Sequence, residues 1–70
     1  MTKNEKKVLT YIRFFWAEEG YSPSLNEIST HMGWKSKSQA SYIVKSLIKT
    51  GRVKSIPGKY RSIEAISVQQ

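Results

Sequence analysis

The segment from Gly33 to Tyr42, GWKSKSQASY, gathers more short polar and cationic side chains than a helix start requires. A helix start needs one capping side chain for its free amides. Here Gln39 can form paired hydrogen bonds with a flat donor–acceptor edge, the serines can donate or accept, and the lysines bind anions. This combination favours non-covalent recognition of a polar, anionic partner.

The charge distribution favours the same kind of partner. The 70 residues carry a formal net charge of +7. No acid lies between Ile28 and Ile63, although ordinary surfaces mix both signs. A basic balance favours polyanions, nucleic acid ahead of an anionic membrane. The cations of this window are Lys35, Lys37, Lys45, Lys49, Arg52, Lys54, Lys59 and Arg61.

The composition argues against several other classes of protein. There is no Cys, so disulfides and thiolate metal sites are excluded and a reducing cytoplasm is favoured. His31 is the only histidine and there is no Asp, so we expect no enzyme, no cofactor, no metal and no small-molecule substrate. His31 is predicted to pair with Glu27 on a helix surface instead. We see neither a signal peptide nor a membrane span, and we expect a cytoplasmic, nucleoid-associated protein.

Helix-start and helix-stop signals divide most of the chain into three helices. Three capping boxes begin at Thr2, Ser24 and Ser36, and a glycine follows each segment. The predicted helices are Lys3–Glu19, Leu25–Met32 and Lys37–Thr50. Their apolar stripes are expected to form one small core, with Trp34 filling the turn between the last two helices. The stripe residues are Val8, Ile12, Phe15, Trp16, Leu25, Ile28, Met32, Ala40, Ile43, Val44, Leu47 and Ile48.

The pattern changes after Gly51 to one that is rich in β-branched residues. It predicts two antiparallel strands, Arg52–Ile56 and Arg61–Ile66, with a turn at Pro57-Gly58 between them. The connecting loop is basic and carries Lys59, Tyr60 and Arg61.

Together these elements predict a mainly α fold with a small β-hairpin, a winged helix-turn-helix in one domain over residues 1–70. Only Gly33, Trp34 and Lys35 separate the second and third helices, so they must cross steeply. That geometry presents the third helix to the major groove of double-stranded DNA. The predicted DNA-binding residues are Ser36, Lys37, Ser38, Gln39, Ser41, Tyr42 and Lys45 on the helix, with Lys59, Tyr60 and Arg61 on the wing.

The arrangement resembles the N-terminal DNA-binding domain of the LexA family of bacterial repressors, without gaps from Thr2 to about Ile66. The most specific matches are Gly20–Ile28 and Gly33–Ser36. The resemblance implies a transcriptional regulator, expected to be a repressor, whose third helix reads bases while the wing contacts the backbone. The reading residues it implies are Ser36, Ser38, Gln39, Ser41 and Tyr42.

The sequence also departs from that family. LexA repressors usually have Asn at the position of Ser38 and acids at those of Ser41 and Tyr42, so the resemblance implies a different target from the SOS operator. The family's C-terminal peptidase domain has no counterpart in these 70 residues. Two interpretations stay open: a domain of a longer repressor, or a small regulator of bacterial or phage type. A homodimer on a palindromic site is compatible with either.

A protein-interaction adaptor built on the same scaffold is the alternative function. Phe14 lies off the main apolar stripe of the first helix, beside Thr10 and Ala17, and is expected to be exposed. A single exposed aromatic residue is common on protein surfaces, so this feature alone does not distinguish the two functions.

Overall fold

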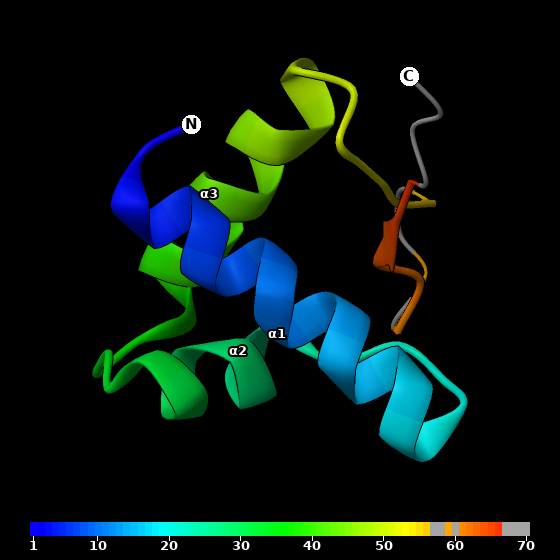
Figure 1. Ribbon diagram of the computed structural model, residues 1–70. Helices are drawn as coiled ribbons and strands as arrows, with labels where there is room; N and C mark the ends of the chain where they lie inside the picture. The colour runs from blue at the N-terminus through cyan, green and yellow to red at the C-terminus, as the bar shows by residue number, and fades with distance from the viewer. Residues whose placement is uncertain (57–58, 60, 67–70) are drawn as a thin grey trace.

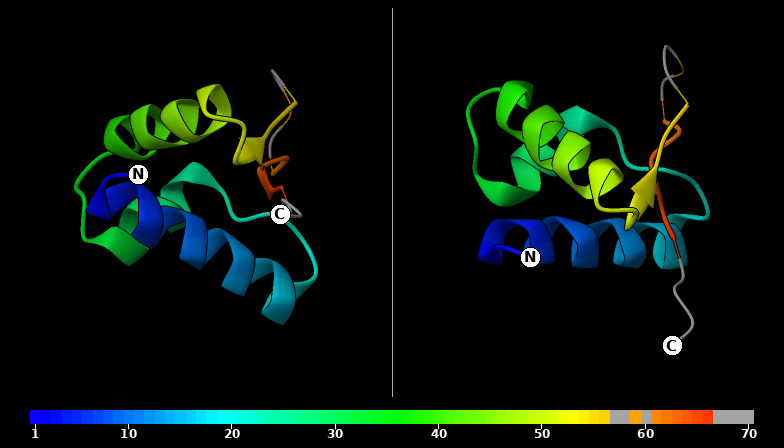
Figure 2. Two further views of the ribbon diagram at one scale, coloured as in Figure 1. Left: turned by 45° about the horizontal axis from the view of Figure 1, so that its top comes forward. Right: turned by 90° about the horizontal axis from the view of Figure 1, so that it is seen from above.

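The computed structural model describes residues 1–56, 59 and 61–66. Three helices come first: α1 (Lys3–Glu19), α2 (Leu25–Met32) and α3 (Lys37–Lys49). Two short strands follow, β1 (Val53–Lys54) and β2 (Glu64–Ala65). The strands lie beyond the C-terminal end of α3 and beside the C-terminal half of α1 (Figures 1 and 2). This is the predicted winged helix-turn-helix.

The first two helices have the predicted bounds because both capping boxes form. The Glu5 amide donates to the Thr2 hydroxyl at 3.1 Å, and the Glu5 carboxylate accepts from the Thr2 amide at 2.8 Å. Ser24 and Glu27 make the same two bonds at the start of α2. Gly33 ends α2 with a left-handed φ of 77°, a conformation that costs other residues more.

The third predicted capping box is wrong. Ser36 occupies the N-cap position of α3, but its side chain makes no capping hydrogen bond. The Ser36 carbonyl instead accepts from the buried Ser29 hydroxyl at 3.0 Å, so the backbone, not a reciprocal side-chain pair, fixes this helix start. At its other end α3 stops at Lys49, and Thr50 is the C-cap rather than the last helical residue.

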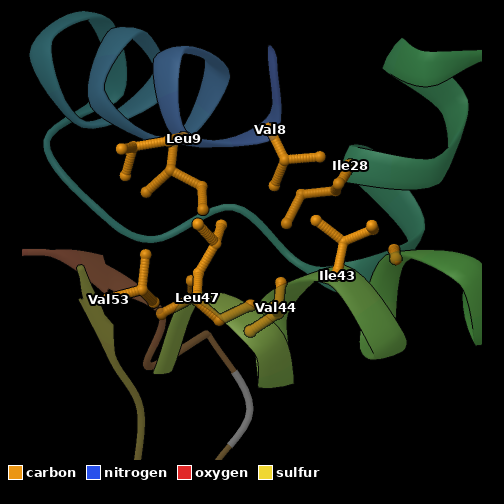
Figure 3. Packing of buried hydrophobic residues seen from close by; sticks show 10 residues of the cluster. Val8, Leu9, Ile28, Ile43, Val44, Leu47 and Val53 are labelled. Atoms are coloured by element: carbon orange, nitrogen blue, oxygen red, sulfur yellow. The ribbon is translucent and has the colours of Figure 1, made fainter. Parts of the chain in front are cut away.

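One hydrophobic core joins all three helices and the sheet (Figure 3). Trp16 and Trp34 are half-buried against it, which confirms the predicted place of Trp34. Ile48 was predicted to be a core residue, but 40% of it is exposed because it lies at the edge of the buried face of α3. The core residues are Val8, Leu9, Ile12, Ile28, Ala40, Ile43, Val44, Leu47, Val53 and Ile63.

The hairpin is antiparallel as predicted, but its regular strands are much shorter. Val53 pairs with Ala65 and Lys54 with Glu64. On the loop side of these pairs a side chain replaces the ladder, because the Ile56 amide donates to the Ser62 hydroxyl at 2.9 Å. Arg61 has a left-handed φ of 56°, which an extended strand does not allow. The predicted Pro57-Gly58 turn lies outside the described residues.

Candidate nucleic-acid interface

The two faces of α3 differ in burial. Ala40, Ile43, Val44 and Leu47 are buried against the other helices. The opposite face begins with the exposed residues 36–39 and continues with Lys45, which is also exposed. Tyr42 is 69% exposed, while Ser41 is half-buried. All the helix residues predicted to bind DNA therefore lie outside the core, and we call this surface the recognition face.

The turn before α3 is held by α2, which sets the direction of the recognition face. Besides its hydroxyl bond to Ser36, Ser29 accepts at its carbonyl from the Trp34 amide at 2.9 Å. Both bonds converge on a residue that is only 4% exposed, so they are shielded from competing water. The core contacts and these bonds together fix α3 against α2 as a helix-turn-helix.

The missing cap leaves the start of α3 suited to an anion. The first amides of a helix have no intrahelical acceptors, and the helix dipole adds a partial positive charge there. Neither an acid nor a capping hydroxyl occupies this position, and Lys37 adds a full charge beside it. A phosphate group fits such a site.

A groove of about 420 Å³ runs between α3 and the wing. We call it the wing groove. Lys37 and Lys45 line it from α3, and Lys59 and Arg61 line it from the hairpin. Among the described residues that line it there is no acid, so a negatively charged strand could lie along it without facing a carboxylate. The remaining lining residues are Ser24, Leu25, Asn26, Ser41, Val44, Ile48, Ser55 and Ile63.

The three predicted wing residues have different environments. Lys59 is exposed, and its amide donates to the Ile56 carbonyl at 3.0 Å. Tyr60 lies outside the described residues. The Arg61 guanidinium forms a two-bond pair with the Glu27 carboxylate, Nη1 to Oε1 at 2.8 Å and Nη2 to Oε2 at 3.1 Å. A contact between Arg61 and DNA stays a prediction, but its guanidinium is engaged within the protein.

The sequence did not indicate that Asn26 and Ser55 line the wing groove. The only sequence signal for Asn26 is its place in the first turn of α2.

The predicted pair of His31 with Glu27 is wrong. His31 stacks on Tyr11 with ring centroids 4.1 Å apart, while Glu27 turns toward Arg61.

The ion pair makes stability dependent on acid pH. Hydrogen bonding from Arg61 holds the pKa of Glu27 below its ordinary value of 4.5. A carboxyl group whose pKa is lower in the folded state than in the unfolded state stabilises the fold at pH values above its unfolded-state pKa. That stabilisation is lost as the pH falls through the folded-state pKa. We expect the free energy of unfolding to fall between about pH 5 and pH 3, and to fall less in Glu27→Gln.

Urea titrations of both proteins across that range measure the difference. The pKa of Glu5 is also lowered, chiefly by the hydrogen bond from the Ser46 hydroxyl. Glu5 is present in both proteins, so its effect on stability cancels in the comparison. Parallel pH profiles would contradict a stabilising role for the ionised Glu27.

The fold and the recognition face define a class of protein, a winged helix-turn-helix DNA-binding domain. The chain belongs to the LexA DNA-binding domain family, because the family model described as "LexA DNA binding domain" matches residues 1–62. None of the helices in the described ranges has the length and apolarity of a membrane span.

Curated relatives support the same family. The chain is 38% identical over 63 residues to the LexA repressor of Hahella chejuensis, an alignment that covers 90% of this chain and 32% of that protein. It is 35% identical over 66 residues to the LexA repressor of a Marinomonas species, covering 94% of this chain and 32% of the relative. The chain thus spans about a third of the length of the curated relatives it matches.

Proposed function

We propose that this chain binds double-stranded DNA sequence-specifically and acts as a LexA-like transcriptional regulator, which we expect to be a repressor. The observation that carries the proposal is the acid-free recognition face, which opens directly beside the basic wing groove. Groove-facing polar side chains read bases, and cations beside them bind phosphate. Family membership supports the same function, and this chemistry requires no cofactor and no catalytic residue.

The proposed roles follow from chemistry and position. Gln39 pairs with N6 and N7 of adenine, and the short hydroxyls of Ser36, Ser38 and Ser41 bond to either kind of base edge. The Tyr42 ring lies against a thymine methyl, or its hydroxyl reaches a phosphate. Lys37 and Lys45 bind guanine or phosphate from α3, and Lys59 binds phosphate from the wing, with Tyr60 as a further proposed contact.

The target is proposed to differ from the SOS operator. Acids on a recognition helix select cytosine and repel phosphate. The recognition face of this chain has Ser41 and Tyr42 where LexA repressors usually have acids, and the helix dipole and Lys37 meet no opposing carboxylate there. We therefore expect a larger non-specific component and a recognition sequence of its own.

Assembly on DNA is proposed to be a homodimer on a palindromic site. A symmetric dimer places its two recognition helices about one helical turn apart, roughly 10 base pairs centre to centre. Selection from random duplexes at physiological salt tests both parts of the proposal. Enriched sites with two related half-sites at that spacing support it, and a pool without any enriched sequence contradicts sequence-specific binding.

Two substitutions separate base reading from backbone binding. Gln39→Ala is expected to lower affinity for the selected site by about tenfold and to relax preference at one base position, because a paired hydrogen bond to a base is lost. Lys59→Ala is expected to weaken all duplexes alike. Binding to the selected site and to single-base variants measures both effects. Equal losses on every duplex for the two proteins would contradict the assignment of Gln39.

A second candidate function is protein interaction through α1. Phe14 is 59% exposed, as predicted, and it lines a hollow of about 520 Å³ with Tyr11, Met32 and two lysines. The two functions are compatible, because the residues that line this hollow and those that line the wing groove are different.

A further inference from the structure

Arg61 connects the wing to the corner between α1 and α2. Its guanidinium makes the two-bond pair with Glu27 on α2 and also donates to the Ser22 carbonyl at 3.0 Å. The same group lies 5.2 Å from the centre of the Tyr21 ring. One side chain of the hairpin therefore contacts three residues of the corner that leads into the helix-turn-helix.

The strand that follows Arg61 is held at the same corner. The Ile63 amide donates to the Ser22 hydroxyl at 2.9 Å, and the Ile63 carbonyl accepts from the Trp16 indole at 2.8 Å. These two bonds hold the base of the wing. Arg61 extends the attachment by two residues toward the loop that carries Lys59, where the regular ladder between β1 and β2 has already ended.

The backbone at Arg61 has a conformation that surrounding contacts must stabilise. Its φ of 56° lies in the left-handed region, which non-glycine residues occupy rarely and at a cost. Such a conformation persists where surrounding contacts hold it. The guanidinium bonds to Ser22 and Glu27 are among the contacts that hold this residue against the corner.

We propose that Glu27 and Arg61 are positioning residues, whose pairing holds Lys59 in place at the wing groove so that Lys59 and the lysines of α3 bind one DNA backbone together. This inference rests on the proposed DNA binding. According to this proposal, Glu27 increases the affinity for DNA although it is an acid that lies next to the DNA interface. Net-charge arguments predict the opposite, because removing a carboxylate should strengthen binding to a polyanion.

The substitution Glu27→Gln distinguishes these two expectations. Glutamine still serves as the third residue of a capping box, so the start of α2 is preserved. It lacks the charge that makes the bidentate pair with Arg61 strong. The matched control is Glu18→Gln, which changes net charge equally at an exposed residue of α1 whose side chain makes no hydrogen bond or ion pair with the described residues. We expect Glu27→Gln to bind about fivefold more weakly than wild type, and Glu18→Gln to bind at least as tightly as wild type.

Coupling to Lys59 separates positioning from a general structural effect. If Glu27 acts through Lys59, Glu27→Gln should make the slope of log K against log salt shallower by about one, as Lys59→Ala does. The double variant should then bind no more weakly than Lys59→Ala alone. Additive losses, or binding by Glu27→Gln as tight as that of the Glu18→Gln control, would overturn the proposal.

Amide exchange in the free protein tests the positioning without DNA. The Ile63 amide, bonded to Ser22, should exchange several-fold faster in Glu27→Gln than in Glu18→Gln, while amides in the middle of α1 should exchange alike. If wild-type protein does not bind duplex DNA, the proposed function fails while this measurement still decides whether the pair holds the wing. Equal exchange at Ile63 in both variants would overturn the positioning role.

Discussion

Leu47→Ala is expected to lower the free energy of unfolding by about 3 kcal/mol, through lost burial and a residual cavity. Leu47 is 0% exposed and lies among Leu9, Val44 and Val53, where α1, α3 and β1 meet (Figure 3). A domain of this length has a total stability of only about 5 kcal/mol. The substitution should therefore leave the folded state favoured by only about 2 kcal/mol, which corresponds to an unfolded fraction of about 3–4%.

The matched control is Ile48→Ala, one residue further along the same helix. Ile48 is 40% exposed, so truncation there removes less buried surface and should cost less than about 1 kcal/mol. Urea denaturation followed by tryptophan fluorescence measures both, because Trp16 and Trp34 are half-buried against the core. Equal losses for the two variants would mean that Leu47 is not the centre of the core.

The second large expected effect is the dependence of DNA affinity on salt. If about five phosphates are neutralised, log K should fall against log salt with a slope of about −4 to −5. Raising salt from about 50 to 200 mM should then weaken binding by several hundredfold. The lysines of the recognition face and wing groove supply the contacts, and no carboxylate among the groove's described residues offsets them.

Fluorescence anisotropy with a labelled duplex across that salt range measures the slope. Lys45→Ala should make the slope shallower by about one, because its ammonium lines the wing groove. Lys6→Ala is the control, since Lys6 lines the hollow beside Phe14 and not the groove. Affinity that stays constant between low and moderate salt would remove DNA binding as the proposed function.

The helices could be predicted closely because their signals are local. A capping box acts over four residues and a terminating glycine at one, so the helix ends at Thr2, Ser24 and Gly33 can be predicted from a few neighbouring residues. The box predicted at Ser36 does not form, and the Ser36 carbonyl accepts a hydrogen bond from the Ser29 hydroxyl seven residues away. Its failure contributes to the site, since it leaves the start of α3 uncapped.

The hairpin was less predictable, because individual side-chain bonds and backbone conformations within it decide where the regular strands end. Propensity and turn signals indicated two strands of five or six residues, whereas only two residues of each form the regular ladder. Ser62 and Arg61 end that ladder through a local side-chain bond and a left-handed backbone. Neither effect has a signature in β-propensity.

The helices, the helix-turn-helix and the basic face were predictable from the sequence, because periodicity, caps and charge are properties of neighbouring residues. The roles of Glu27 and Arg61 depend on the folded chain. They are 34 residues apart in the chain, yet their charges meet at 2.8 Å once the core has brought the wing against α2. The contact of Arg61 with DNA stays a prediction, and the structure adds a bond within the protein that the sequence could not reveal, because an ion pair depends on distance in space and not on distance along the chain.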